Sequence, residues 1–229
     1  MKMPEFNSKV LNIFTDASIT KIDSGEYISC SGAVAYTGTL DNLTMIDEVF
    51  QVNWDSTNNN GEITAILKGI ELALTYRDQF ESINLFSDSK ICIYGLREWI
   101  KSWVQKSKGN VLIGSQNLPV ANQEVIIKCI NLILDNNLDI KLYHQKGHAT
   151  DRNLPVAVQT FKSSNNIGNY VPNEFLRVIN SNNNYVDTKS RDVLNETYMY
   201  VPHEKPIDLV SRMYDPNVDI DRYLALVNN

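Results

Sequence analysis

The chain has 229 residues, of which 43% are hydrophobic, a size that suits one domain with additions or two small domains. A formal net charge of −6 gives no global sign of nucleic-acid binding, so any such function must reside in a local site. No run reaches the roughly 18 apolar residues that a membrane span needs, and the first residues lack the apolar core of a secretion signal. Three widely spaced cysteines in apolar stretches predict buried free thiols and a reducing, cytoplasmic location: Cys30, Cys92 and Cys129.

The first part of the chain is predicted to form three strands and a helix. The strands are expected at 9–15, 28–37 and 44–54, and the polar, glycine-containing connections between them favour an antiparallel meander. The amphipathic pattern of the next segment predicts a helix over about 61–77. Glu62 lies in the apolar stripe of this helix, where a carboxylate is unfavourable unless another group compensates its charge.

The second part is predicted to alternate strands and helices. A short strand is expected at 82–88, a helical stretch at about 89–106, an amphipathic helix at about 121–135 and a last strand at 138–145. This order predicts an α/β fold with a five-stranded mixed sheet flanked by helices, in which three antiparallel strands are followed by two parallel ones.

The carboxy-terminal part departs from that pattern. Asparagine- and serine-rich runs on both sides of an apolar patch at 174–179 predict an insertion loop over residues 150–182 that carries one short helix. The last core helix is predicted to begin at Asp187. Residues 197–229 are expected to add a helical extension of two short helices, packed on the main body.

Three carboxylates stand where a ligand site is expected. Asp16 ends the first predicted strand, Asp88 ends the fourth, and Glu62 begins the helix between them. Ligands of α/β sheets usually bind beyond the carboxyl ends of the strands. A single aspartate after a strand is most often a turn or capping residue, but converging carboxylates raise one another's pKa unless a cation offsets them. Hard oxygen ligands suit Mg²⁺ or Mn²⁺, so a metal ion is the predicted partner of Glu62.

Seven short motifs resemble, in the same order, those of type 1 ribonucleases H, which cut the RNA strand of RNA–DNA hybrids. They are IFTDAS, TNNNGE, SDSK, REWIKSW, LPVANQE, HQKGHAT and NNYVDTKSR. Each motif alone is weak, but seven in family order are specific. The resemblance covers roughly residues 9–149 and 183–196, and it implies a ribonuclease H-like catalytic domain over residues 1–196, interrupted by the insertion.

The resemblance also implies the chemistry. Two Mg²⁺ ions, for which Mn²⁺ would substitute, activate a water and stabilise the leaving 3′ oxygen, so the products carry 5′-phosphate and 3′-hydroxyl ends. His148 would lie at the rim of the site and move protons or help the product leave, whereas His144 is interpreted as structural. The four implied metal ligands are Asp16, Glu62, Asp88 and Asp187.

Substrate contacts follow from the same resemblance. Asn58 and Asn59 would read 2′-hydroxyl groups beside the scissile phosphate, and Thr57 with Asn122 would hold a phosphate of the DNA strand. The alternative, a simple turn and helix cap, stays open for 57–59 and is preferred for Asn60. The remaining implied substrate contacts are Ser18, Trp99 and Trp103.

Several features differ from most relatives. The gap between His148 and Asp187 is unusually long, and Asp151, Glu174 and Asp192 are the other acidic residues in a position to supply a fourth ligand. Only three lysines lie between Trp99 and Gly109, so hybrid binding is expected to be weaker and more sensitive to salt: Lys101, Lys106 and Lys108. We expect a monomer, with the insertion or the extension as the place for any protein partner.

Two alternative functions remain. A catalytically idle member of the fold that binds nucleic acid or protein would not need mutually repelling carboxylates. A DNA-processing relative such as a 3′–5′ exonuclease generally pairs two acids as Asp-x-Glu on the first strand, whereas Ser18 stands two residues after Asp16 here.

Overall fold

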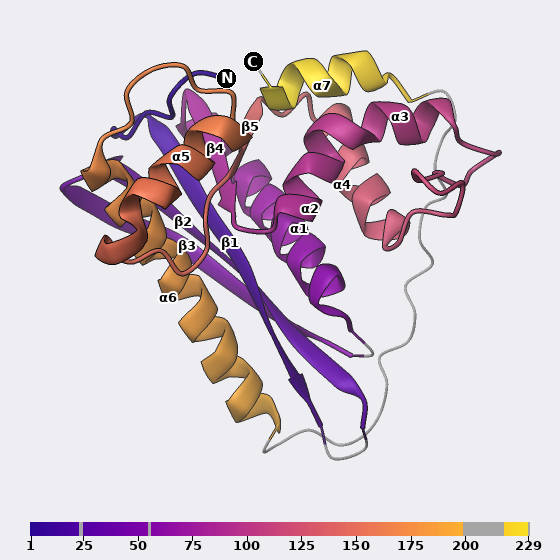
Figure 1. Ribbon diagram of the computed structural model, residues 1–229, viewed down its shortest axis with the longest axis horizontal. Helices are drawn as coiled ribbons and strands as arrows, with labels where there is room; N and C mark the ends of the chain where they lie inside the picture. Colours follow the sequence, from indigo (N-terminus) through magenta and orange to yellow (C-terminus); the bar gives the residue numbers. More distant parts are fainter. Residues whose placement is uncertain (23–24, 55, 199–217, 229) are drawn as a thin grey trace.

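A five-stranded mixed sheet forms the centre of the computed structural model, which describes residues 1–22, 25–54, 56–198 and 218–228 (Figure 1). The strand order is β3-β2-β1-β4-β5. The strands β1 and β2 and the strands β2 and β3 pair antiparallel, whereas β1–β4 and β4–β5 are parallel, as predicted. The bounds are β1 (Val10–Lys21), β2 (Tyr27–Thr39), β3 (Asn42–Asn53), β4 (Ser82–Ser87) and β5 (Ile140–His144).

Helices cover both faces of the sheet (Figure 1). On one face, Leu11 and Ile13 of β1 pack in a core with the first and fourth helices; on the other, Phe14 packs in a second core with the fifth and sixth. This separation follows from the alternation of side chains along a strand. The helical elements are α1 (Asn58–Tyr76), η1 (Arg77–Gln79), α2 (Lys90–Tyr94), η2 (Gly95–Trp99), α3 (Ile100–Gln105), α4 (Gln123–Asp135), η3 (Asp151–Asn153), α5 (Leu154–Ser164), α6 (Asn173–Tyr198) and α7 (Ile220–Asn228).

Aromatic rings build the second core across three strands. Phe14, Phe86 and Tyr143 occupy paired positions on β1, β4 and β5. The rings of Phe14 and Phe86 stack with centroids 5.0 Å apart, and those of Phe86 and Tyr143 with centroids 5.3 Å apart. Phe161 of α5 and Phe175 of α6 continue the cluster, with their centroids 5.1 Å apart. The segment expected to loop out therefore contributes to the core.

The prediction of a loop over residues 150–182 was wrong, because η3, α5 and the first part of α6 occupy most of it. The boundary between insertion and last core helix falls inside one continuous helix, and Asp187 lies within that helix instead of beginning it. Packing against β1 and β2 stabilises a segment whose asparagines have low helix propensity. The buried positions of α6 recur at helical spacing: Phe175, Leu176, Ile179, Asn180, Asn183, Val186, Ser190 and Leu194.

The stretch predicted as helical over 89–106 contains a π-helical turn, η2, between α2 and α3. Arg97 in this turn is 3% exposed, and its guanidinium donates to the carbonyls of Leu142 and Ser164 and to Asn165 Oδ1. A buried arginine is favourable only with such partners. Arg97 thereby joins η2 to β5 and to the end of α5.

Of the two short helices predicted after residue 197, α7 is described, and residues 199–217 lie outside the described part of the chain. Tyr223 and Val227 of α7 are buried in the same core as α1 and α4. All three cysteines are buried free thiols, as predicted. None of the helices in the described ranges is long and apolar enough to cross a bilayer.

Candidate active site

Asp16 and Asp88 come together because of the register of two parallel strands. The pairing of β1 with β4 ends at Thr15 and Ser87, so both aspartates are the next residues along the chain. Asp88 directly follows β4, one residue beyond the observed strand end, whereas β1 continues past Asp16 to Lys21 in antiparallel pairing with β2. Asp16 therefore lies where the parallel half of the sheet stops and an antiparallel ribbon continues.

Glu62 reaches the same place because α1 approaches β1 closely. A methyl group at Gly61 would lie 3.0 Å from the side chain of Ala17, and one at Gly69 would lie 2.7 Å from Leu85 Cδ1. The absence of side chains at both glycines thus allows this contact. Glu62, in the first turns of α1, is consequently buried against the sheet at 7% exposure.

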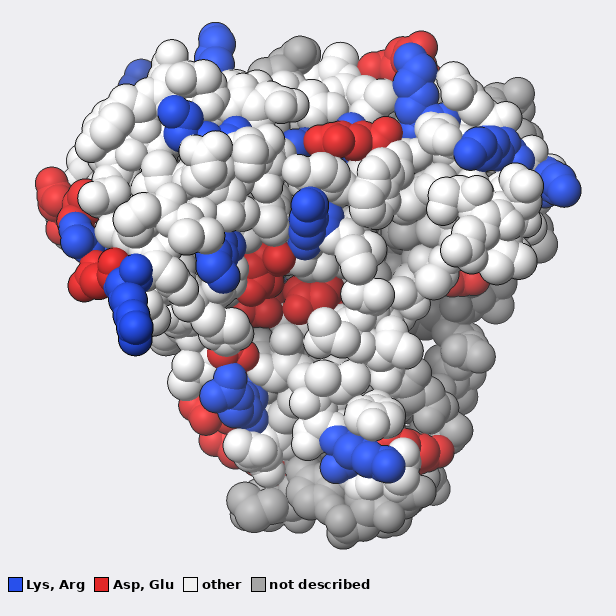
Figure 2. All heavy atoms as spheres, in the orientation of Figure 1, with Lys and Arg blue, Asp and Glu red and all other residues white. Residues whose placement is uncertain are grey.

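Asp16, Glu62 and Asp88 form a compact acidic group, since one carboxylate oxygen from each lies within 4.8 Å of the others. Burial and then the charge of Asp88 raise the pKa of Asp16 to about 8. Burial and then the charge of Asp16 raise the pKa of Glu62 well above its usual value, and burial is also the main cause that raises the pKa of Asp88. Acidic side chains gather in a hollow near the centre of the face shown in Figure 2.

The donor set fits a divalent cation. Glu62 Oε2 is buried and has no hydrogen-bond partner among the residues that the structure describes. Asp16, by contrast, accepts a hydrogen bond from the backbone N–H of Ala17 at Oδ1 and one from Asn183 Nδ2 at Oδ2. Converging carboxylates with an unpaired buried oxygen are the oxygen-rich environment that Mg²⁺ and Mn²⁺ prefer.

Asp187 lies at the margin of this group. Its Oδ1 accepts from Ser18 Oγ at 3.0 Å, and its Oδ2 pairs with Arg191 Nη2 at 2.7 Å. Its charge still contributes to raising the pKa of Asp16, of Glu62 and of Asp88. Ser18, expected to contact substrate, contacts Asp187 here.

Two of the other three acidic residues considered as a fourth ligand bind a different partner. Asp151 and Glu174 both bind Arg177, at 2.8 Å and 3.4 Å from its guanidinium nitrogens. Asp192 is exposed. Asp187 is therefore the acidic residue of α6 that faces the carboxylate group.

The loop that follows β5 crosses over Asp88. A methyl group at Gly147 would overlap the Asp88 carboxylate, so this backbone passes in direct contact with the acidic group. His148 is exposed on this loop, and its charge lowers the pKa of Asp88, against the larger effect of burial. His144 is buried within hydrogen-bond distance of the Asp88 carbonyl (Nε2–O 3.2 Å), and burial lowers its pKa to about 4. A neutral, buried His144 agrees with a structural role.

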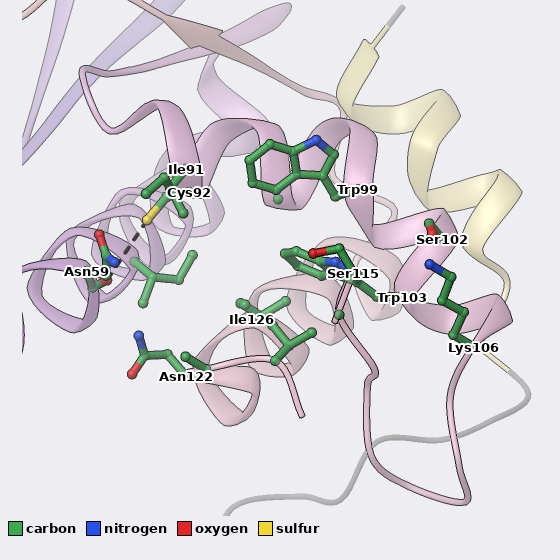
Figure 3. A pocket seen from close by; sticks show the side chains of 15 residues that line it. Asn59, Ile91, Cys92, Trp99, Ser102, Trp103, Lys106, Ser115, Asn122 and Ile126 are labelled. Carbon is green, nitrogen blue, oxygen red and sulfur yellow. Dashed lines mark hydrogen bonds between the residues drawn. The ribbon is translucent and has the colours of Figure 1, made fainter. Parts of the chain in front are cut away.

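A pocket of about 570 Å³ opens between the start of α1, the helical segment from α2 to α3, and α4 (Figure 3). It brings together four of the residues expected to contact substrate, namely Asn59, Trp99, Trp103 and Asn122. Asn59 and Asn122 lie at one end and Lys106 at the other (Figure 3). Lys101, in contrast, forms an ion pair with Asp221 of α7, with Nζ and Oδ1 2.7 Å apart.

The amino terminus of α1 combines capping with a link that the sequence did not indicate. Thr57 caps the helix, its Oγ1 accepting from the backbone N–H of Asn60, and the side chains of Asn58 and Asn59 are exposed. The side chain of Asn60 donates to Asn122 Oδ1 at 3.1 Å. Asn60, interpreted only as a cap residue, thus joins the starts of α1 and α4.

Gln145 was also missed as a site residue. It is fully buried, and its Nε2 donates to Asn183 Oδ1 at 2.5 Å. Its position in the HQKGHAT motif, directly after the apolar part of a strand, is the signal in the sequence, since an apolar residue would be ordinary there.

A mixed sheet with an acidic group at the junction of its parallel and antiparallel halves defines the class of ribonuclease H-like proteins. A model of the RNase H family matches residues 8–159, more than half of the chain. The chain belongs to the RNase H family. The match ends before α6, so it does not include Asp187.

Curated relatives and solved structures are consistent with this membership. The chain is 34% identical over 106 residues to a ribonuclease H of Ruthia magnifica subsp. Calyptogena magnifica, covering 46% of this chain and 66% of that protein. It is 31% identical over 97 residues to a ribonuclease H of Schizosaccharomyces pombe, covering 42% of this chain and 32% of that protein. These matches span less than two thirds of the relatives' own length.

Two solved structures share the fold at low sequence identity. The PFV RNase H domain has a TM-score of 0.51 at 14% identity, covering 69% of this chain and 96% of that chain. The foamy viral protease–reverse transcriptase in complex with an RNA/DNA hybrid has a TM-score of 0.56 at 14% identity, covering 81% of this chain and 20% of that one.

Proposed function

We propose that this chain is a metal-dependent endonuclease that hydrolyses the RNA strand of RNA–DNA hybrids, leaving 5′-phosphate and 3′-hydroxyl ends. The observation that supports it best is the convergence of Asp16, Glu62 and Asp88, with Glu62 Oε2 buried and unpaired within the described residues. A protein that only bound nucleic acid would gain nothing from buried carboxylates that repel one another and the phosphate backbone. Membership of the RNase H family points the same way.

The acidic residues would hold the metal. Asp16, Glu62 and Asp88 supply the central oxygens, and Asp187 supplies a fourth carboxylate at the margin. These residues would hold two Mg²⁺ ions, for which Mn²⁺ would substitute, and the bound metal would supply water activation and stabilisation of the leaving 3′ oxygen. Burial is the main cause that raises the pKa of the three central carboxyl groups, and cations would offset the mutual repulsion that adds to it.

The loop after β5 would supply the proton carrier. His148 is exposed at the edge of the acidic group, where an imidazole could act as a general acid or base. The loop backbone rests on Asp88 at Gly147, so His148 is held at the rim of the site. It would accept or deliver a proton, or help the cleaved strand leave.

Substrate recognition would use the exposed amides at the start of α1 and the aromatic wall of the neighbouring pocket differently. Asn58 and Asn59 expose amide side chains that can donate to and accept from the 2′-hydroxyls of the RNA strand. The pocket walled by Trp99 and Trp103 is largely apolar, as suits a strand without 2′-hydroxyls, and Asn122 at its end would bind a DNA phosphate. We also propose that α7 is part of the same catalytic unit, because it shares the core of α1.

A hybrid with different dyes on its two strands tests the proposal. With Mg²⁺ present, the RNA strand should be cut internally into pieces that a polymerase can extend from their 3′ ends, while the DNA strand stays whole. Asp88→Asn is the control, since it removes one central oxygen and should keep the fold by circular dichroism but cut nothing. Cutting of the DNA strand, or parental activity in Asp88→Asn, would contradict the proposal.

A further inference from the structure

Two consecutive hydrogen bonds between buried amide side chains end on Asp16. Gln145 Nε2 donates to Asn183 Oδ1 at 2.5 Å, and Asn183 Nδ2 donates to Asp16 Oδ2 at 2.8 Å. Gln145 is 0% exposed and Asn183 is 1% exposed. The chain of bonds joins the end of β5, the middle of α6 and the centre of β1.

The direction of this chain follows from the chemistry of its ends. With a cation bound, Asp16 would be ionised and would only accept hydrogen bonds, so Asn183 must turn its NH₂ group toward Asp16 and its oxygen toward Gln145. Gln145 must then present its own NH₂ group, because two amide oxygens facing each other would repel. The consequence is visible at the far end, where Gln145 Oε1 is buried without a partner in the described part of the chain.

We infer that Gln145 is a positioning residue, which fixes the amide of Asn183 so that an N–H group holds Asp16 Oδ2. The other oxygen of Asp16 is held by the backbone N–H of Ala17 at 2.7 Å. A carboxylate fixed at both oxygens keeps further lone pairs free and is already oriented when a cation arrives. The inference rests on the proposed function only in taking Asp16 as a metal ligand.

A space-filling role for Gln145 makes a different prediction. If the side chain only occupied volume between β5 and α6, an apolar side chain of the same length would serve equally well. In the positioning role, loss of the donor leaves Asn183 Oδ1 without its partner and its amide free to rotate. The two roles are therefore separated by removing the donor and keeping the size.

The test compares Gln145→Met with the unaltered protein in two measurements without nucleic acid. In the metal-free protein, NMR follows hydrogen exchange of the Asn183 side-chain NH₂ group, which should become faster in the variant. Calorimetry measures the Mn²⁺ affinity. This affinity should weaken about 10-fold, which is the lower end of the losses seen when a group that supports a metal ligand is removed. Gln145→Leu serves as a second variant that lacks the donor if Gln145→Met does not fold.

The matched control is Asn12→Leu. Asn12 lies on the same strand as Asp16, is 0% exposed and accepts from Asn84 Nδ2 at 2.9 Å, so this variant loses a comparable buried bond between two amides. It should lose stability but keep the Mn²⁺ affinity. Unchanged exchange in Gln145→Met, or faster exchange with unchanged Mn²⁺ affinity, would overturn the inference alone. An unaltered protein that bound no Mn²⁺ would instead refute the proposed function, and the exchange measurement would still decide how Asn183 is held.

Discussion

Arg191 holds Asp187 in an ion pair one helical turn away on α6, with Nη2 and Oδ2 2.7 Å apart. Because Ser18 binds the other oxygen, both oxygens of Asp187 are engaged at the margin of the acidic group. The positive charge of Arg191 offsets the negative charge of Asp187, so this fourth carboxylate can lie close to the three central ones. A bound metal ion would have to compete with Arg191 for this carboxylate.

Asp187→Asn should reduce hybrid cleavage by several orders of magnitude, since it removes the charged oxygen at that margin. Asp192→Asn, on the exposed side of the same helix, should change the rate by less than about twofold. Single-turnover cleavage with excess enzyme measures both rates. The opposite ranking would show that the fourth carboxylate is misassigned.

Gly147→Ala should weaken metal binding and slow cleavage, because the added methyl group would overlap the Asp88 carboxylate. Gly168→Ala is the matched control, as no described atom lies within 4 Å of the position of its added methyl group. Titration of each variant with Mn²⁺ gives the affinity, and an affinity loss confined to Gly147→Ala is expected. Equal affinities would mean that the loop moves aside at no cost.

The stability of the metal-free protein should fall as pH rises from about 5 to about 8. The pKa of Asp16 is raised by burial from 3.8 to about 8 in the folded chain, so unfolding releases a proton throughout that window. The stabilising effect of the protonated form is complete below the unfolded pKa and is lost as pH rises through the folded one. One such group contributes at most about 1.4 kcal/mol per pH unit.

Thermal unfolding in EDTA at several pH values measures this slope. Asp16→Asn should make it shallower, because one of the carboxyl groups with a raised pKa is gone. Saturating Mg²⁺ should weaken or reverse it, since a cation favours the ionised carboxylates. A metal-free protein whose Tm rose steadily over the same window would contradict the electrostatic account of the site.

Replacing Asn58 and Asn59 together by Ala should lower hybrid cleavage at subsaturating substrate by about an order of magnitude. Each lost hydrogen bond to a 2′-hydroxyl contributes about 1 kcal/mol, and both side chains are exposed, so the fold should not suffer. Steady-state kcat/KM measures the effect. No change on the hybrid would leave these asparagines with a purely structural role at the start of α1.

The sequence predicted the sheet and the three central carboxylates well because local patterns determine both. Apolar runs of strand length define the strands. Asp88 directly follows one strand and Glu62 lies in the helix after another, so the correct strand register is enough to bring these residues together. The extent of β1 beyond Asp16 was not predictable in this way. Its second half is stabilised by pairing with β2, a non-local interaction.

Helix α6 was mispredicted for a related reason. The run from Asn180 to Asn184 has low helix propensity, so composition indicated a loop, whereas Ile179, Asn183 and Val186 are buried at helical spacing. Tertiary packing on β1 and β2 overrides the local preference. The contact of Gln145 with Asn183 depends on that packing and was equally unpredictable from the sequence.

The most direct test of the central claim is cleavage of four labelled substrates of one sequence, each with Mg²⁺ and with EDTA. They are an RNA–DNA hybrid, single-stranded RNA, double-stranded RNA and duplex DNA. The proposed function, in which four carboxylates hold a cation and Asn58 and Asn59 read 2′-hydroxyls on one strand, predicts cutting of the hybrid's RNA strand in Mg²⁺ and no cutting elsewhere. Equal cutting of all four substrates, or cutting in EDTA, would contradict the account.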